Sequence, residues 1–241
     1  MKNRYLGATP PKVKHEVNNN RKNIVNSDRN SHDLQIRQTD PKADAPNDKN
    51  AEFIFCFPIC IPYVKSSPKN WTAEGKVTSV KDQGTCGSCW AFSGVAAIES
   101  SYLIEKDEEL DLSEQQILDC SVSYDGCLGG WMTYVFEDAI AYGIEKEENY
   151  PYQGKQSASC KKNNGEFKIK SYETTLTCQN IVDSVVEEGP MSVGVFTDSN
   201  WFSYSEGVFS CSSISNPFEA NHGVVITGVT AEGNFIIKNS W

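Results

Sequence analysis

Hydrophobic positions divide the chain near residue 53. Residues 1–52 have no sustained hydrophobic period and are rich in Asn, Lys, Asp and Pro, a composition typical of disordered or weakly helical segments. A strongly apolar run over 53–64 follows, but it is interrupted by Pro58 and Pro62 and is too short to span a membrane. We therefore expect a largely disordered head over residues 1–67 and a packed domain over residues 68–241.

The packed domain begins with helical spacing. The pattern predicts a helix over residues 88–106. Glu99 falls within its apolar stripe, and a carboxylate there is expected to have partners inside the fold. The stripe comprises Phe92, Val95, Ala96, Tyr102 and Leu103.

Two shorter helices are predicted next. One covers residues 112–118, where Ser113 can cap the first turn and Gln116 can complete a capping box. The other covers residues 131–142 and ends at Gly143, which suits the position just after a helix.

The second half of the domain has the character of strands. Strands are expected over residues 192–196, 223–228 and 234–238, with one short helical stretch over 181–187. Helices followed by strands indicate an α+β fold. We expect a helical lobe over about 75–172 and a β lobe over about 173–241, with a cleft between them.

Charge and cysteine content narrow the setting of the protein. The net charge is −10, and the packed domain is acidic while the head is slightly basic, which argues against nucleic-acid binding. Nine cysteines indicate an oxidising, secretory setting, and the sequon at Asn70 is compatible with it. The first residues have no apolar core of signal-peptide length.

Cys89 lies where a glycine-broken loop turns into the first predicted helix. Unpaired backbone N–H groups and the positive end of the helix dipole both favour a thiolate there. Cys86 and Cys89 also form a C-x-x-C unit, as in thiol–disulfide exchange, although the strand-rich βαβ unit expected before such a motif is absent. Zinc binding is disfavoured because Cys120 and Cys127 are too far apart and have no histidine near them.

A nucleophilic cysteine needs a base, and His222 is the one histidine outside the head. It comes 133 residues after Cys89 and just before a predicted strand. Asn239 follows the next strand, so two neighbouring antiparallel strands would place it beside His222. An imidazole there can take the thiol proton and leave a thiolate–imidazolium pair.

The packed domain resembles the papain family of cysteine peptidases, in its cathepsin L-like branch. The resemblance spans about residues 68–241, with the matching segments in family order. These are Val77–Gly84, Cys86–Ser93, Leu112–Cys120, Gly126–Gly130, Asn149–Tyr152, Asn221–Gly223 and Lys238–Trp241.

The resemblance implies a two-lobed papain-like fold and a cysteine endopeptidase. It implies Cys89 as nucleophile, His222 as general acid and base, Asn239 as the amide that holds the imidazole, and Gln83 as an oxyanion donor together with the Cys89 backbone N–H. Trp241 would shield the Asn239–His222 contact from water. Substrate-binding positions implied in the same way, with an apolar preference in the second subsite, are Gly87, Gly129, Gly130, Trp131, Met132, Ala220, Asn221, Gly223 and Trp241.

Disulfides Cys86–Cys127 and Cys120–Cys160 are implied by the resemblance, and pairing of Cys178 with Cys211 is a further hypothesis. Cathepsin B-like relatives carry a loop with paired histidines, which the packed domain lacks. No cofactor and no metal is expected. The expected partners are protein and peptide substrates and cystatin-like inhibitors, for a monomer that is lysosomal, vacuolar or secreted.

Both ends of the chain depart from the family pattern. The head is expected to act as a shortened pro-segment, with the apolar run 53–64 in or near the cleft and cleavage around residues 64–69. Relatives continue beyond Trp241, so an incomplete β lobe is expected. Two other functions remain open at this point: a non-catalytic papain-like interaction protein, and the C-x-x-C oxidoreductase.

Overall fold

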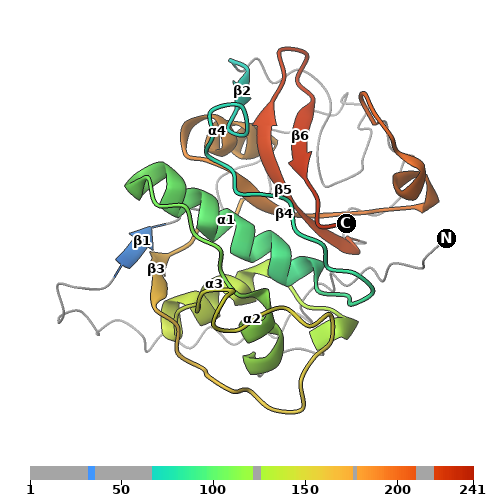
Figure 1. Ribbon diagram of the computed structural model, residues 1–241. Coiled ribbons are helices and arrows are strands. Elements are labelled where there is room, and N and C mark those ends of the chain that lie inside the picture. The colour runs from blue at the N-terminus through green and yellow to red at the C-terminus, as the bar shows by residue number, and fades with distance from the viewer. Residues whose placement is uncertain (1–31, 36–66, 122–125, 176–177, 210–219) are drawn as a thin grey trace, which may run out of the picture.

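The structure is a computed structural model that describes residues 32–35, 67–121, 126–175, 178–209 and 220–241. Helix α1 crosses the middle of the molecule, with the other helices of the first half on one side and a sheet on the other (Figure 1). The helical side comprises α1 (Cys89–Lys106), α2 (Glu114–Cys120), the short 3-10 helix Gly126–Leu128, α3 (Met132–Ala141) and β3 (Phe167–Ser171). The sheet side comprises β2 (Lys69–Asn70), α4 (Cys178–Glu187), β4 (Met191–Val195), the 3-10 helix Ser199–Ser203, β5 (His222–Val229) and β6 (Phe235–Lys238).

Two separate hydrophobic cores support this division. The first gathers residues between Cys86 and Ile169, mainly from α1, α2, α3 and β3. The second gathers residues between Ile181 and Val229, from α4, β4 and β5. The expected α+β fold class, with helices followed by strands, is confirmed.

Helix α1 begins and ends where the sequence predicts, but its burial differs from the prediction. Instead of one apolar stripe, fourteen of its eighteen residues are buried, because the helix packs against the helical core on one side and against β4 and β5 on the other. A helix covered on several sides needs small and apolar residues all round. Gly94 and Ala97 meet that need on the sides away from the stripe.

Helix α2 confirms one half of the predicted capping box and corrects the other. The hydroxyl of Ser113 accepts a hydrogen bond from the Gln116 N–H at 3.0 Å. The Gln116 side chain, however, does not return to the cap. It donates to the Gly143 carbonyl at 3.2 Å and accepts from the Glu145 N–H, because the segment after α3 lies beside α2 and offers buried backbone groups that need partners.

Helix α3 and the segment after it match the prediction. Trp131 is its N-cap and Tyr142 its C-cap. Gly143 follows with φ +78°, and its N–H bonds back to Asp138 and Ala139. This left-handed ending is the one that favours glycine.

Strand β5 organises the sheet. It pairs antiparallel with β2, β4 and β6, and all eight of its residues are buried. A strand covered on both faces is expected to be rich in β-branched residues, and β5 contains Val224, Val225, Ile226, Thr227 and Val229. The three strands expected in this half are confirmed to within one residue at each end, and the expected helical stretch is confirmed as α4, which begins three residues earlier than predicted.

The head contributes one strand that the sequence did not predict. Residues His32–Gln35 form β1, which pairs in parallel with β3 (Figure 1). The apolar run 53–64 lies outside the described residues, and so does the expected cleavage region up to residue 66.

Two disulfides fasten the helical lobe, Cys86–Cys127 and Cys120–Cys160, the pairs that the resemblance implies. They close segments of 41 and 40 residues, which restricts the unfolded chain. Cys56, Cys60 and Cys211 lie outside the described residues, so the hypothesis of a Cys178–Cys211 bond stays a prediction.

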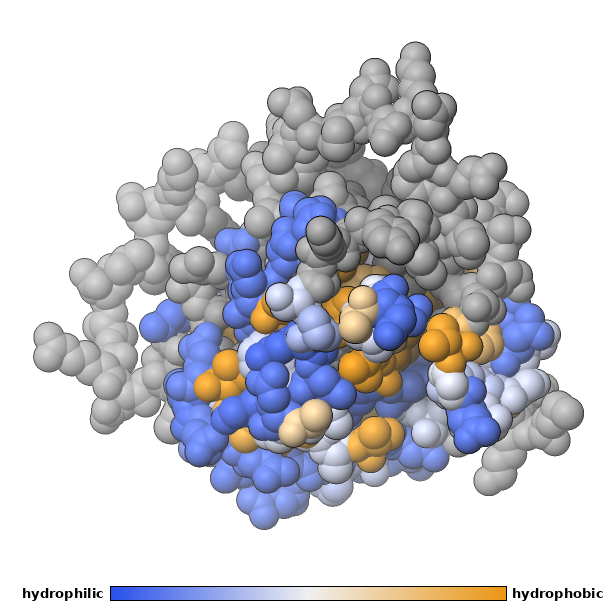
Figure 2. Space-filling view, turned by 90° about the horizontal axis from the view of Figure 1, so that it is seen from above, coloured by the Kyte–Doolittle hydropathy of each residue, from blue (hydrophilic) through white to orange (hydrophobic). Residues whose placement is uncertain are grey.

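The described part of the surface is mostly hydrophilic on the face drawn in Figure 2, with hydrophobic side chains in small patches. None of the helices in the described ranges is long and apolar enough to cross a membrane.

Candidate active site

Cys89 is the first residue of α1 and is fully buried. It lies outside both disulfides. The N-cap residue Ser88 makes no side-chain hydrogen bond to the helix. No Ser88 hydroxyl therefore caps the backbone N–H groups of the first turn, at the end of the helix where Cys89 lies. Such a terminus stabilises a thiolate.

Strand β5 begins directly against this helix start. A Cβ atom added to Gly223 would lie 3.0 Å from the Cys89 carbonyl oxygen. One turn further along α1, the Ser93 hydroxyl donates to the Val224 carbonyl at 2.6 Å. His222 immediately precedes Gly223. The close approach of Gly223 to Cys89 therefore also keeps the His222 backbone near the start of α1.

The geometry fixes the roles of the two ring nitrogens of His222. Asn239 Oδ1 lies 2.8 Å from His222 Nε2 and also accepts the Ser240 N–H at 2.8 Å. The second bond identifies that amide atom as oxygen, so Nε2 must be the ring nitrogen that carries a hydrogen. Nδ1 then has the lone pair in the neutral ring, and it makes no hydrogen bond within the described part of the chain.

Trp241 packs against the His222 ring. Its ring centroid lies 4.7 Å from that of His222, and the same ring stacks on Phe202 at 4.9 Å. Excluding water from a hydrogen bond strengthens it electrostatically.

Burial is the main influence on the pKa of His222 when no negative charge lies beside its ring. The side chain is fully buried, and this lowers the pKa of the imidazole to about 4, while the bond to Asn239 works in the opposite direction. Without a nearby negative charge the ring is therefore neutral at pH 7.

Gln83 is held on several sides in a fully buried position. Its Oε1 accepts the Ser240 hydroxyl at 2.8 Å, and its backbone N–H donates to the Ser240 carbonyl at 2.9 Å. Its Nε2 donates to the Cys86 carbonyl at 2.9 Å. The Gln83 amide is thus hydrogen-bonded both to Cys86, in the loop before Cys89, and to Ser240, the residue after Asn239.

Comparison with known proteins agrees with this geometry. Residues 66–241 match the model of the "Papain family cysteine protease". The chain belongs to this family. Its relatives include cathepsin L 2 of Paramecium tetraurelia, 37% identical over 209 residues, which cover 83% of this chain and 61% of the relative. The thiol protease SEN102 of Hemerocallis sp. is 40% identical over 184 residues, which cover 71% of this chain and 49% of the relative. The chain therefore spans about half to three fifths of the length of these papain-family relatives.

Solved structures show the same fold. The proform of the ragweed pollen cysteine protease Amb a 11 has a TM-score of 0.61 and 34% identity, over 75% of this chain and 57% of that one. The digestive procathepsin L 3 of Tenebrio molitor has a TM-score of 0.63 and 30% identity, over 79% and 65% of the two chains.

The papain-family positions expected to bind substrate on the helical lobe lie in different surroundings. Gly87 donates its N–H to the Cys127 carbonyl at 2.9 Å, so that group is engaged within the loop. Gly130 is buried, and a Cβ there would lie 2.5 Å from the Trp90 ring. Met132 belongs to the helical core, with 4% of its surface exposed.

Trp131 brings the helical lobe against the β lobe. A Cβ atom on Gly194 would lie 2.7 Å from the Trp131 ring and 3.3 Å from Ala220 Cβ. The next residue, Asn221, turns its side chain to Thr197 and makes three hydrogen bonds with it. Trp131 and Ala220 are thus neighbours across the two lobes, while the Asn221 amide has a structural role. Gly129, with φ +132°, and Gly223 complete the expected set.

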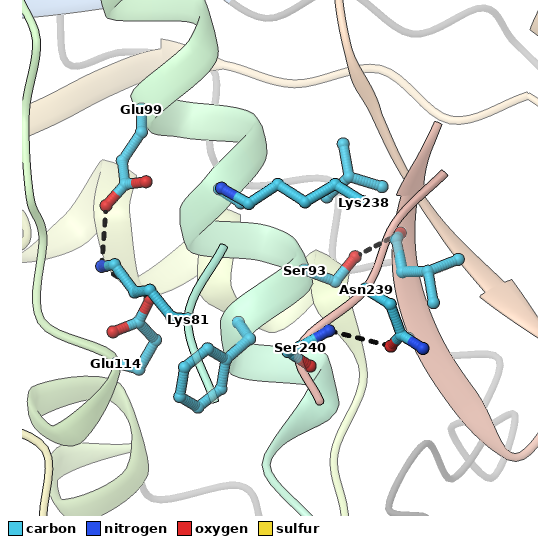
Figure 3. A pocket seen from close by; sticks show the side chains of 12 residues that line it. Lys81, Ser93, Glu99, Glu114, Lys238, Asn239 and Ser240 are labelled. Atoms are coloured by element: carbon cyan, nitrogen blue, oxygen red, sulfur yellow. Dashed lines mark hydrogen bonds and ion pairs between the residues drawn. The ribbon is translucent and has the colours of Figure 1, made fainter. Parts of the chain in front are cut away.

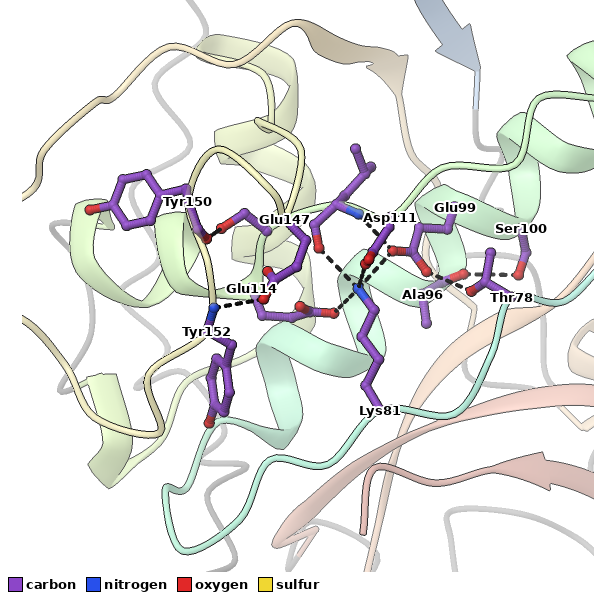
Figure 4. Close-up of polar contacts among 12 residues, drawn as sticks. Thr78, Lys81, Ala96, Glu99, Ser100, Asp111, Glu114, Glu147, Tyr150 and Tyr152 are labelled. Carbon is purple, nitrogen blue, oxygen red and sulfur yellow. Dashed lines mark hydrogen bonds and ion pairs between the residues drawn. The ribbon is translucent and has the colours of Figure 1, made fainter.

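A buried ionic cluster lies beside this site. Lys81 Nζ contacts Glu99 and Glu114 at 3.0 Å each and Asp111 at 2.7 Å (Figure 4). Glu99 is fully buried and also accepts the Thr78 hydroxyl and the Leu112 N–H. The prediction that Glu99 has partners inside the fold is confirmed.

The cluster and Asn239 share one small pocket. Lys81, Glu99 and Glu114 line one side of it, and Lys238, Asn239 and Ser240 line the other (Figure 3). Burial raises the pKa of Glu114 to about 8, although Lys81 opposes the rise. Burial also lowers the pKa of Lys238.

Sequence reasoning missed three residues that the structure places at the site. Ser240 binds Gln83, Lys81 is the centre of the cluster, and Tyr152 binds both Ser88 and Gln83. Tyr152 lies within a family-matching segment, which was the available signal. Lys81 and Ser240 also lie in matching segments, but only the folded chain shows their partners. In the described residues, no group of three or more His, Cys, Asp and Glu forms a metal-binding arrangement.

Proposed function

We propose that the protein is a cysteine endopeptidase in which Cys89 and His222 form a thiolate–imidazolium pair. One observation carries the proposal: His222 uses Nε2 to bind Asn239, which leaves Nδ1 for a proton from Cys89, on a strand that begins against the Cys89 backbone. Membership of the papain family supports it. The activity assigned here is that of the whole protein, of which this chain spans a part of the length seen in its relatives.

The first half of the reaction makes a thioester. The Cys89 thiolate attacks the carbonyl carbon of the scissile peptide bond, and the C=O electrons move onto oxygen. Gln83 Nε2–H and the Cys89 backbone N–H stabilise that oxyanion. The C–N bond then breaks, and the imidazolium of His222 gives its proton to the departing amine.

The second half regenerates the thiol. His222, now neutral, takes a proton from water as the water attacks the thioester carbonyl. The C–S bond breaks, the carboxylic product leaves, and the proton returns to the Cys89–His222 pair. Asn239 holds the ring in the same orientation through both halves of the reaction. Its Oδ1 binds Nε2 of His222, whereas the proton is exchanged at Nδ1.

Substrate binding is proposed along the loop that contains Gly129 and Gly130. An extended peptide would pair with this backbone as an added strand. Trp131, Met132, Ala220 and Gly223 give the second subsite an apolar character. Because Met132 is almost fully buried, Trp131 and Ala220 supply most of the accessible apolar surface at these positions.

The proposal extends to setting and partners. The substrates are proteins and peptides, cystatin-like proteins are candidate inhibitors, and the protein acts as a monomer in a lysosome or vacuole or after secretion. The head acts as a pro-segment, and the match to structures in the proform supports this.

The test combines labelling with cleavage. The full chain is first incubated at acidic pH to release the head, it is then treated with iodoacetamide, and the labelled residue is identified by mass spectrometry. The same chain is assayed on a peptide with a large apolar residue two positions before the scissile bond. We expect stoichiometric labelling of Cys89 and cleavage, both strongly reduced in His222→Ala and unchanged in His15→Ala, which removes a histidine of the head.

Other outcomes separate the alternatives. Labelling without cleavage of any peptide would favour the non-catalytic papain-like protein. Reversible oxidation of Cys89 with Cys86 would favour the oxidoreductase, but Cys86 is bonded to Cys127 in the structure, which supports the peptidase.

A further inference from the structure

The phenol of Tyr152 bridges the two segments that carry the proposed oxyanion donors. Its oxygen lies 2.6 Å from the Ser88 hydroxyl and 2.8 Å from the Gln83 carbonyl oxygen. Ser88 immediately precedes Cys89, and Gln83 carries the side-chain donor.

The two hydrogen bonds form a relay from Ser88 through Tyr152 to Gln83, and the number of available hydrogens fixes its direction. The Gln83 carbonyl can only accept, so Tyr152 must donate its single phenolic hydrogen to it. The Ser88 hydroxyl must then donate to the phenol oxygen, because that oxygen has no further hydrogen to give. Tyr152 therefore donates a hydrogen bond to the segment of Gln83 and accepts one from the segment of Ser88.

Burial makes the relay hard to replace. Ser88 and Gln83 are both fully buried, and a buried hydroxyl or carbonyl without a partner is costly. Ser88 is also the N-cap of α1 but does not use its hydroxyl to cap the helix. The Ser88 hydroxyl bonds to Tyr152, whereas a serine at an N-cap usually accepts a hydrogen bond from a backbone N–H of the first turn.

The phenol itself is held in place. Its ring makes an edge-to-face contact with Phe92 at 4.9 Å, and the Tyr152 N–H donates to Glu147 at 2.6 Å. Burial raises the pKa of Tyr152 to about 12, against the effect of the Ser88 bond. The phenol therefore keeps its donor hydrogen throughout the pH range in which proteins are active.

We propose that Tyr152 is a positioning residue that sets the distance between the Gln83 amide and the Cys89 N–H, and so the width of the oxyanion hole. This inference rests on the proposed peptidase function. Oxyanion donors act only within a narrow range of distances from the developing charge, so a shift of either segment weakens the stabilisation. The hydrogen bond that orients His222 comes from Asn239 and not from Tyr152.

The experiment compares Tyr152→Phe with Tyr150→Phe. Tyr150 lies in the same short segment and also has a buried phenol, which donates to Asp119 and accepts from the Lys161 N–H. Each variant loses one hydroxyl with two hydrogen bonds, but only Tyr152 is connected to Gln83 and Ser88. Ser88→Ala is the second test variant, because it removes the other end of the relay.

Two readouts are measured on each variant and on the unchanged chain. Peptide cleavage passes through an oxyanion, whereas alkylation of Cys89 by iodoacetamide does not. For Tyr152→Phe we expect kcat to fall by about tenfold or more, with KM and the alkylation rate within about twofold of the unchanged chain. Tyr150→Phe is expected to keep kcat and the alkylation rate. Tyr152→Phe and Ser88→Ala combined should lower kcat by less than the product of the single effects, because both break one relay.

The outcomes separate this inference from the function on which it rests. If the unchanged chain neither labels at Cys89 nor cleaves peptides, the proposed function fails. If it does both and Tyr152→Phe cleaves as well as Tyr150→Phe, the positioning role is wrong. Equal losses of alkylation and cleavage in Tyr152→Phe would show a general structural role and would also overturn the inference.

Discussion

The ammonium of Lys81 lies 3.0 Å from the carboxylate of Glu99, whose side chain is fully buried. The same ammonium is 3.0 Å from Glu114, which is almost fully buried as well. The ammonium of Lys81 thus lies against two acidic side chains that water cannot reach.

Replacing this cation should be strongly destabilising. In Lys81→Met the side chain keeps most of its volume, but the buried acidic groups of Glu99 and Glu114 lose the ammonium that contacts them. We expect a loss of about 3–5 kcal/mol in the free energy of unfolding at pH 7, measured by urea denaturation. Lys76→Met is the control, since Lys76 pairs with the exposed Asp107, and it should lose little. A loss in Lys81→Met no larger than in Lys76→Met would show that the Lys81 ammonium does not stabilise the cluster.

Glu114 should make the protein less stable as the pH rises. Its pKa is raised from 4.5 to about 8 in the folded state, chiefly by burial. Between these values the folded chain holds a proton that the unfolded chain releases, so the free energy of unfolding decreases with pH, by up to about 1.4 kcal/mol per pH unit. Glu114→Gln should remove this contribution, as shown by urea denaturation from pH 4.5 to 8. The exposed Glu105→Gln should keep it, and an unchanged slope in Glu114→Gln would contradict the assignment.

His222 should titrate differently with and without the thiol of Cys89. Burial, opposed by the hydrogen bond to Asn239, lowers the pKa of His222 to about 4, and a thiolate beside the ring would raise that pKa by Coulomb attraction. We expect His222 to titrate near pH 4 in Cys89→Ala and at clearly higher pH in the unchanged chain. NMR of the imidazole signals measures this, with His222→Gln to assign the signal. Identical titration in both proteins would exclude the ion pair.

Features that depend on neighbouring residues could be predicted from the sequence. The bounds of α1, the Ser113 cap and the ending of α3 at Gly143 depend on local patterns of hydrophobicity and capping, and the structure has them all. The contact between His222 and Asn239 follows from two adjacent antiparallel strands.

Features that depend on distant segments could not be predicted. The Gln116 side chain binds backbone groups 27 and 29 residues away instead of completing the capping box. Helix α1 is buried all round because both lobes pack on it, which periodicity within the helix does not reveal. The Tyr152 relay joins residues 64 and 69 positions apart, so only the folded chain shows it.

Gly223 should control how closely His222 approaches Cys89. A Cβ atom at this position would lie 3.0 Å from the Cys89 carbonyl oxygen, 3.2 Å from its carbonyl carbon and 3.3 Å from Ser93 Cβ. Two of these atoms are backbone and cannot turn aside, so Gly223→Ala must move the start of β5 away from α1. We expect the alkylation rate of Cys89 and kcat/KM to fall together by about tenfold or more, with a loss of about 1–3 kcal/mol in stability.

Gly94→Ala is the matched control for Gly223→Ala. Its Cβ would lie 2.7 Å from Val135 Cβ, inside the helical lobe, so it crowds the same helix without touching β5. It should lose stability by a similar amount and keep the alkylation rate per folded molecule. Iodoacetamide labelling and urea denaturation of both variants decide the matter. If Gly94→Ala slows labelling as much as Gly223→Ala does, the effect comes from general loosening of α1, and the approach of β5 to Cys89 does not set the reactivity of the thiol.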